Sequence, residues 1–161
     1  MPTIASHVWR PSGARRVVLD GFLPVPRGTI PSTPAPLAWP AKDPADVLDY
    51  EFDVSAALLG NRGDTIATID VAIVPNALGD LTLVSSAADG PIAVFWFSHG
   101  QVGTIYAVQV TMNTASGRTL SRAILLPVQS LATAAAPIEA LTTDTGNVVT
   151  DQSGNPILIG G

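Results

Sequence analysis

The chain has 161 residues, of which 47% are hydrophobic and only 13% charged, with 14 glycines, 14 prolines and no cysteine. This length suits one domain of about 100 to 130 residues with additional segments, and it is too short for two ordinary domains. The hydrophobic content excludes disorder of the whole chain, and the lack of cysteine excludes disulfides and thiolate metal sites. No apolar run approaches the ~18 residues that a membrane-spanning helix needs, so we expect a soluble protein.

The formal net charge of −5 conceals a division along the chain. Residues 1–42 carry a balance of +4, with Arg10, Arg15 and Arg16 among the cations, whereas residues 43–161 carry −9. The cations are widely spaced and have no aromatic residues interleaved among them, which is a weak basis for nucleic-acid binding. We therefore expect the basic segment to dock on an acidic protein partner rather than on nucleic acid.

Nine of the fourteen prolines precede residue 45. Proline removes a backbone donor and fixes φ, so residues 23–44 should form neither a regular helix nor a central strand. We predict an extended, Pro-rich basic arm over residues 1–44. Within it, residues 16–23, which include Phe22, are apolar enough for one strand if they join the body of the protein or another chain.

From residue 47 the pattern becomes that of short strands. Between residues 48 and 54 every second residue is apolar and the others are acids, which is typical of a strand with one solvated face. Further strands are expected at residues 65–74, 81–84, 92–97, 104–113 and 119–128. Short strands with turn signals every 8 to 12 residues predict an all-β fold, a single immunoglobulin-like antiparallel β-sandwich over residues 45–129.

The C-terminal residues 130–161 are predicted to form a linker and a β-hairpin tail. Residues 143–149 are echoed by 150–157, each a polar turn followed by an apolar pair. Such a hairpin has too little apolar area to be stable alone. We expect it to add to a partner's sheet, with Ile157 and Ile159 as interface residues.

Several residues could carry chemistry, and each has a simpler explanation. Asp49, Glu51 and Asp53 share one strand face and could act as acid and base or hold a hard cation, but alternating acids on a strand are usually solvated. His99 is interpreted as a turn residue, and the sequence contains no nucleophile or nucleotide-binding motif. We predict no catalytic residue, no metal site and no cofactor.

Three consecutive aromatic residues raise a question of burial. On a strand, Trp96 must face one side while Phe95 and Phe97 face the other, whereas a sandwich strand has one buried face. Either the Pro-rich arm folds back over the second face, or a neighbouring subunit covers it, or Trp96 fills the core and the phenylalanines stay partly exposed. Trp39, Phe95 and Phe97 are therefore candidate interface residues.

Four segments carry a resemblance to a known family. Residues 49–53 (Asp-Tyr-Glu-Phe-Asp), 63–67, 94–108 and 111–122 resemble the immunoglobulin-like phage proteins labelled fiber-tail adaptors. The match spans residues 49–128, and His99 stands where the family commonly has glycine. The segment around Tyr106 also resembles the tyrosine corner of sandwich domains, in which the hydroxyl bonds to backbone. The resemblance assigns structural roles to Trp96, Gly103, Tyr106 and Gly117.

The resemblance implies a non-enzymatic virion protein made in the host cytoplasm. It would be a tail or neck adaptor that connects the tail ring to tail fibers through its arms, with copies of itself in a ring and no membrane contact. One alternative is a capsid decoration or head-fiber protein. Another is a carbohydrate- or surface-binding module that uses Phe95, Phe97, Trp9 or Trp39 as stacking platforms.

Overall fold

The computed structural model describes residues 12–19, 27–30, 34–60, 63–132, 141–143 and 146–157. The chain divides into two compact units, residues 1–130 and 131–161. Three of the predicted interface residues, Arg10, Phe22 and Ile159, lie outside the described residues.

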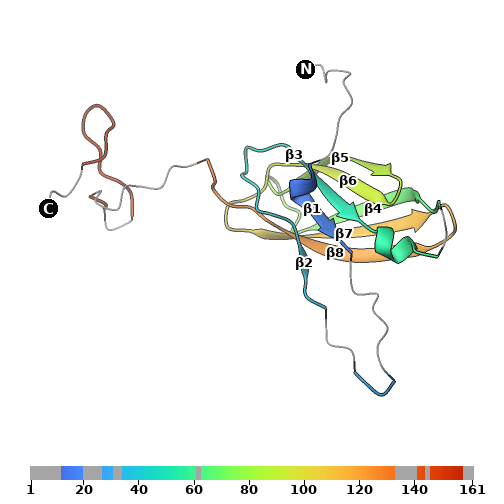
Figure 1. Cartoon of the computed structure of the whole chain (residues 1–161). Helices are drawn as coiled ribbons and strands as arrows, with labels where there is room; N and C mark the ends of the chain where they lie inside the picture. The colour runs from blue at the N-terminus through green and yellow to red at the C-terminus, as the bar shows by residue number, and fades with distance from the viewer. Residues whose placement is uncertain are drawn as a thin grey trace. The chain divides into compact units, whose positions relative to one another are not determined.

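The first unit contains two stacked four-stranded sheets (Figure 1). Sheet A has, in spatial order, β1 (Arg16–Val18), β3 (Leu48–Asp53), β6 (Ile92–Ser98) and β5 (Thr82–Asp89). Sheet B has β2 (Leu37–Ala38), β8 (Thr119–Pro127), β7 (Ile105–Thr114) and β4 (Ile66–Val74). Two 3₁₀ turns, η1 (Gly13–Arg15) and η2 (Ser55–Leu58), are the helical elements of the described residues. The predicted all-β sandwich is confirmed.

The sheets are mixed, whereas the sequence predicted antiparallel pairing alone. β1 pairs parallel with β3, and β2 pairs parallel with β8. The remaining pairings are antiparallel. Alternation of apolar and polar residues reveals a strand but not its direction, and the long connections that leave β1 and β2 permit the parallel arrangement.

Two stretches of the Pro-rich segment belong to the sandwich. β1 and β2 are the outermost strands of their sheets, where flanking prolines interrupt no central ladder. Val17 and Leu19 are buried in the core, and the main-chain N–H of Leu19 donates to the carbonyl of Asp53 at 2.8 Å. Residues 16–19 thus join the body of the protein, the first of the two options that the sequence left open.

One strand is longer than predicted. β5 was expected to end at residue 84, but it continues to Asp89 with a register shift between Leu83 and Ser85. Its second half, Ser85 to Ala88, has low intrinsic strand preference and resembles a turn in sequence. Pairing with β6 along its whole length overrides that preference.

The core between the sheets settles which aromatic residues are buried. Phe95 and Phe97 are fully buried and Trp39 is 2% exposed, whereas Trp96 lies on the outer face and is half-buried. The Trp39 ring centroid lies 5.6 Å from that of Tyr50 and 5.8 Å from those of Phe95 and Phe97. Trp39 from the Pro-rich segment therefore covers the phenylalanine face, and the alternative in which Trp96 fills the core is wrong.

The second unit is ordered by backbone hydrogen bonds. Two antiparallel turns are closed by Thr143 N–H to Asn147 C=O and by Asp151 N–H to Asn155 C=O, both 2.8 Å. Three further backbone bonds form a closed cycle among Leu141, Val149 and Ile157, which follow one another at intervals of eight residues. Leu141 donates to Ile157, Ile157 to Val149, and Val149 to Leu141. In place of a single hairpin, the tail therefore has two consecutive turns whose ends are joined by the three cyclic hydrogen bonds.

Candidate interaction surfaces

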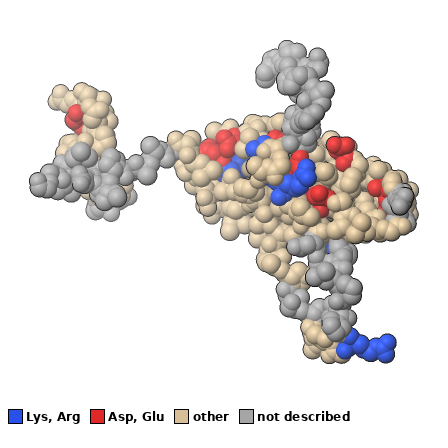
Figure 2. Space-filling model, in the orientation of Figure 1, with Lys and Arg blue, Asp and Glu red and all other residues tan. Residues whose placement is uncertain are grey.

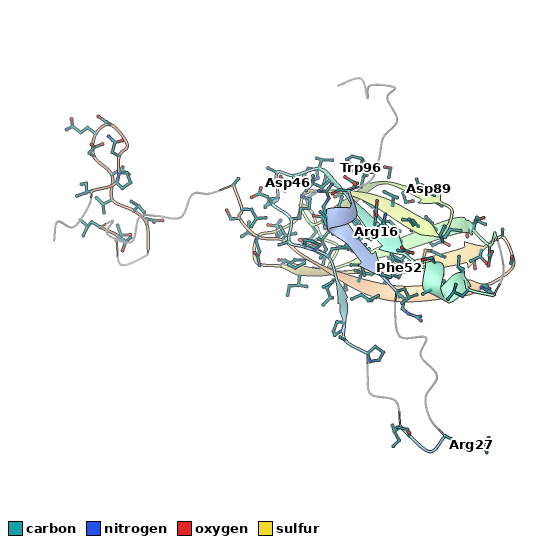
Figure 3. All side chains as sticks on the ribbon, viewed as in Figure 1. Arg16, Arg27, Asp46, Phe52, Asp89 and Trp96 are labelled. Atoms are coloured by element: carbon teal, nitrogen blue, oxygen red, sulfur yellow. The ribbon has the colours of Figure 1, made fainter. Side chains whose placement is uncertain are left out.

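The acids of β3 are covered by arginines instead of being solvated. Asp49 and Glu51 are 6% and 1% exposed, although they lie on the outer face of sheet A. Arg15 Nη2 lies 2.5 Å from Asp49 Oδ1, and Arg16 Nε lies 2.5 Å from Glu51 Oε2. Figure 2 shows these opposite charges side by side, and Figure 3 labels Arg16 over the sheet. The parallel register, which places Arg16 beside Glu51, brings the pairs together.

In these ion pairs each partner stabilises the charged form of the other. Burial raises the pKa of Asp49, but hydrogen bonds from the Ser12 N–H and the Arg15 side chain outweigh it and hold that pKa below its ordinary value. The hydrogen bond to Glu51 raises the pKa of Arg16. Arg15 and Arg16, which we expected to meet a partner, therefore engage acids of their own chain, while 23% and 37% of their side-chain surfaces remain exposed.

Lys42 is fully buried at one end of the sandwich, a feature that sequence reasoning missed. Its Nζ donates to the main-chain carbonyls of Asp43 at 2.6 Å, His99 at 2.9 Å and Pro44 at 3.4 Å. Burial is the main cause that lowers the pKa of Lys42, with opposing contributions from the Asp46 and Asp43 carboxylates. A single lysine in a Pro-rich stretch gives no sequence signal for such a site.

Tyr106 joins two loops at the same end. Its hydroxyl donates to Asp80 Oδ1 and accepts the Gln101 N–H, both at 2.8 Å. The bond to backbone five residues upstream has the form of a tyrosine corner. Gly103, the predicted structural glycine nearby, has φ +81° and donates its N–H to the Val128 carbonyl at 2.9 Å. The acidic partner, Asp80, was not predicted.

Asp64 organises the opposite turn of sheet B. Its carboxylate accepts the Thr114 hydroxyl and the Ser116 N–H, both at 3.0 Å. These bonds outweigh the effect of burial and keep the pKa of Asp64 below its ordinary value. They fix the β7–β8 hairpin, in which Gly117 adopts φ +84°.

The stacking platforms proposed for a carbohydrate-binding module are not available in the sandwich. Phe95, Phe97 and Trp39 are in the core and present no ring face to solvent. The fourth candidate, Trp9, lies outside the described residues. Nothing in the described chain thus supports that alternative.

The second unit has exposed apolar side chains that a partner could bury. None of its described residues is buried, and Leu141 and Ile157 are 41% and 42% exposed. The cyclic set of backbone bonds fixes the main-chain positions of both residues relative to each other. A unit whose described residues form no buried core gains stability when a partner covers these side chains.

The described residues include no group of three or more His, Asp or Glu side chains able to hold a metal ion. In the same residues there is no helix with the length and apolarity needed to cross a bilayer. The polar side chains described above form ion pairs and hydrogen bonds within the chain or lie on exposed surfaces.

Comparison with known proteins adds one finding. A family model described as "Podophage GP4 fiber-tail adaptor protein gp77" matches residues 42–127. The matched range begins at the buried Lys42 and runs to the end of β8, so it covers β3 to β8 together with Lys42, Tyr106 and Asp64. No curated protein matches the chain.

Proposed function

We propose a function from the premise that this chain belongs to the podophage fiber-tail adaptor family, whose model covers more than half of its residues. The family makes the protein a component of the phage virion that meets other tail proteins and fibers. Our proposal is that the sandwich is a non-enzymatic connector between the tail ring and the fibers, and that segments outside the matched range make the contacts.

The family match over the sandwich carries this proposal. A rigid body that needs no disulfide keeps the spacing between two neighbours, and the pairings of β1 and β2 with its sheets anchor the N-terminal segments to it. The strand order β3–β6–β5 in one sheet faces β8–β7–β4 in the other, and β2 pairs parallel with β8. This topology supports an immunoglobulin-like assignment.

We assign fiber attachment to the second unit. Its exposed apolar side chains, Leu141 and Ile157, extend from main chain that the cyclic backbone bonds hold in place, and they lie outside the family match. Features outside the shared core suit a partner peculiar to one virion. We also propose that copies of the chain form a ring, because ring symmetry multiplies weak contacts into firm attachment.

The test uses a phage defective in this gene, complemented with the intact chain or with a Leu141→Asp, Ile157→Asp double variant. The proposal expects complemented particles to carry fibers and the double variant to yield tails without them, with the adaptor still present. Gln152→Asp, an exposed position in one turn of the same unit, is the matched control.

Two results would contradict the proposal. Fibers attached normally in the double variant would remove the second unit from the connection. Hundreds of copies spread over the capsid, instead of tens at the tail, would favour the capsid decoration alternative.

A further inference from the structure

The two lateral sides of the sandwich differ. On one side, β1 and β2 are the last strands of sheets A and B, and Val17 and Trp39 close the core beneath them. On the other side the last strands are β4 and β5, which contact each other across the sheets (Figure 1). No described segment of the chain covers this second side, so both strands keep a free edge.

The core is incompletely sealed at the open side. Ile69, Val71 and Ile73 of β4 alternate toward the core, yet each is only half-buried, as is Leu83 of β5. Phe52 and Leu126, on the inner strands β3 and β8 that β1 and β2 cover, are fully buried. The half-buried side chains of β4 leave room for an extended apolar segment like those that β1 and β2 supply at the closed side.

A cleft lies at this open side. It has a volume of about 400 Å³ and is lined by Val71, Ala72, Ile73, Asn76, Leu81, Thr82 and Leu83. Val84 and Leu78 nearby are 56% and 102% exposed. Five of the seven lining residues are apolar, and polar atoms also face the cleft, a mixture that suits a peptide segment whose side chains and main chain are both in contact.

The free edge of β5 has one feature that hinders strand addition, the register shift between Leu83 and Ser85, and no other from Ser85 to Ala88. Sheet edges are normally protected by charged residues or proline. Residues 82–88 of β5 contain neither, and the side chains from Ser85 to Ala88 are small and exposed. An incoming strand would meet no steric or electrostatic obstacle there.

Charge indicates which segment could occupy the cleft. The open-side strands carry two exposed acids, Asp70 of β4 and Asp89 of β5, and no lysine or arginine. Residues 1–19 contain three arginines and no acid, and two of these, Arg15 and Arg16, are engaged within the chain. Arg10 and the residues before it thus provide the opposite charge to the open side.

We propose that residues 3–9 of a second copy lie in the β4–β5 cleft and pair as an added strand with β5. This segment, Thr-Ile-Ala-Ser-His-Val-Trp, places Ile4 and Val8 on one face of a strand as apolar anchors. Its extended length of about 23 Å matches β5, which has eight residues. β1 and β2 already associate with the sheets by such edge pairing.

The contact is heterologous, because the donor segment and the acceptor cleft belong to different parts of the surface. Repeated head-to-tail contacts of this kind close into a ring when the rotation permits. The inference rests on the proposed self-association of the chain and is independent of which fiber the second unit binds.

The experiment measures the mass of the full chain by sedimentation velocity over a wide concentration range. The intact chain should form assemblies larger than a monomer. Ile73→Lys places a charge in the cleft and should weaken assembly by about tenfold or more. Val74→Lys is the control, since this neighbouring side chain is 53% exposed and does not line the cleft.

A donor variant makes the test independent of any folding defect in Ile73→Lys. Ile4→Asp with Val8→Asp lies outside the described sandwich and should also yield monomers. Mixing this donor variant with Ile73→Lys leaves one intact donor and one intact cleft, so the mixture should form dimers and nothing larger. A cooperative urea unfolding transition of Ile73→Lys shows separately that this variant is folded.

Three outcomes would overturn the inference. The intact chain remaining monomeric at all concentrations would remove the second copy as occupant. Assembly unchanged by both variants would place the self-contact elsewhere while leaving the ring intact, and a mixture without dimers would exclude the head-to-tail geometry. None of these outcomes bears on fiber attachment, which the phage complementation tests separately.

Discussion

Trp39 donates its indole N–H to the main-chain carbonyl of Glu51, 2.8 Å away, and thereby joins the two sheets. Its own backbone N–H donates to the Leu125 carbonyl of β8 at 2.9 Å, so the residue is held in sheet B while its side chain reaches sheet A. Together with its aromatic contacts, this places one residue of the Pro-rich segment at the centre of the core.

Substitution of Trp39 should therefore be among the most destabilising single changes in the sandwich. Trp39→Ala should lower the free energy of unfolding by about 3 to 5 kcal/mol, because a large buried side chain is removed. Trp39→Phe keeps an aromatic ring but leaves the Glu51 carbonyl without its indole donor, a loss of about 1 to 3 kcal/mol. Urea denaturation of the full chain measures both, and a negligible effect of Trp39→Ala would mean that the segment does not close the core.

The strands of the sandwich could be predicted because their sequences alternate with period two. β1 and β2 could not be placed in the same way, since strands of three and two residues among prolines carry no periodic signal. Their positions depend on tertiary contacts, such as Trp39 entering between Tyr50 and Phe95. The segment's composition therefore indicated an arm, although part of it completes the fold.

In the candidate sites, too, the sequence predicted one residue of an interaction but not its distant partner. The alternation of acids on β3 correctly places Glu51 on the outer face of sheet A, but not the arginine that covers it. Arg16 precedes Glu51 by 35 residues, and only the parallel register of β1 brings the two side chains together. The tyrosine corner was predictable from a local motif, whereas its partner Asp80 lies 26 residues away on another loop.

Lys42 offers a test of a buried charge that is satisfied by carbonyls. Lys42→Met retains most of the apolar stem but removes the donor shared by the carbonyls of Asp43, Pro44 and His99. We expect a loss of about 2 kcal/mol, the range for hydrogen bonds to a charged group. Thermal and urea unfolding at neutral pH provide the measurement.

The pH dependence distinguishes this role from simple packing. Burial lowers the pKa of Lys42 below 10.5, so the folded chain releases this proton before the unfolded chain does. Stability contributed by the site therefore rises with pH as 10.5 is approached. The difference between the intact chain and Lys42→Met should grow over that range, and a pH-independent difference would contradict the assignment.

Tyr50 has a buried hydroxyl without a hydrogen-bond partner among the described residues. Tyr50→Phe removes a group that gains nothing in the folded state, so we expect the stability at neutral pH to stay within about 1 kcal/mol or to increase. A loss of 2 kcal/mol or more would show that the hydroxyl has a partner, such as a buried water.

The same substitution should alter the alkaline limit of stability. Burial raises the pKa of Tyr50 to about 12, above its ordinary value of 10. The folded chain thus holds this proton longer than the unfolded chain, and the stability linked to it, complete below pH 10, is lost between pH 10 and 12. Tyr50→Phe should unfold less readily than the intact chain in this range, and because Lys42 is present in both proteins its titration cancels.

His99 adopts φ +59°, and it is the one non-glycine residue of the described chain with positive φ. Such a conformation costs a residue with a Cβ about 1 to 2 kcal/mol, and glycine loses part of that gain through the entropy of the unfolded chain. His99→Gly should therefore stabilise the sandwich by up to about 1 kcal/mol. The carbonyl that accepts the Lys42 Nζ hydrogen bond belongs to the backbone and is retained.

His99→Ala is the control, because it removes the contact between the imidazole and Ser98 Oγ at 2.9 Å but keeps the Cβ. Urea midpoints should rank His99→Gly above the intact chain and His99→Ala no higher than it; the reverse order would mean that the imidazole contact outweighs the backbone strain.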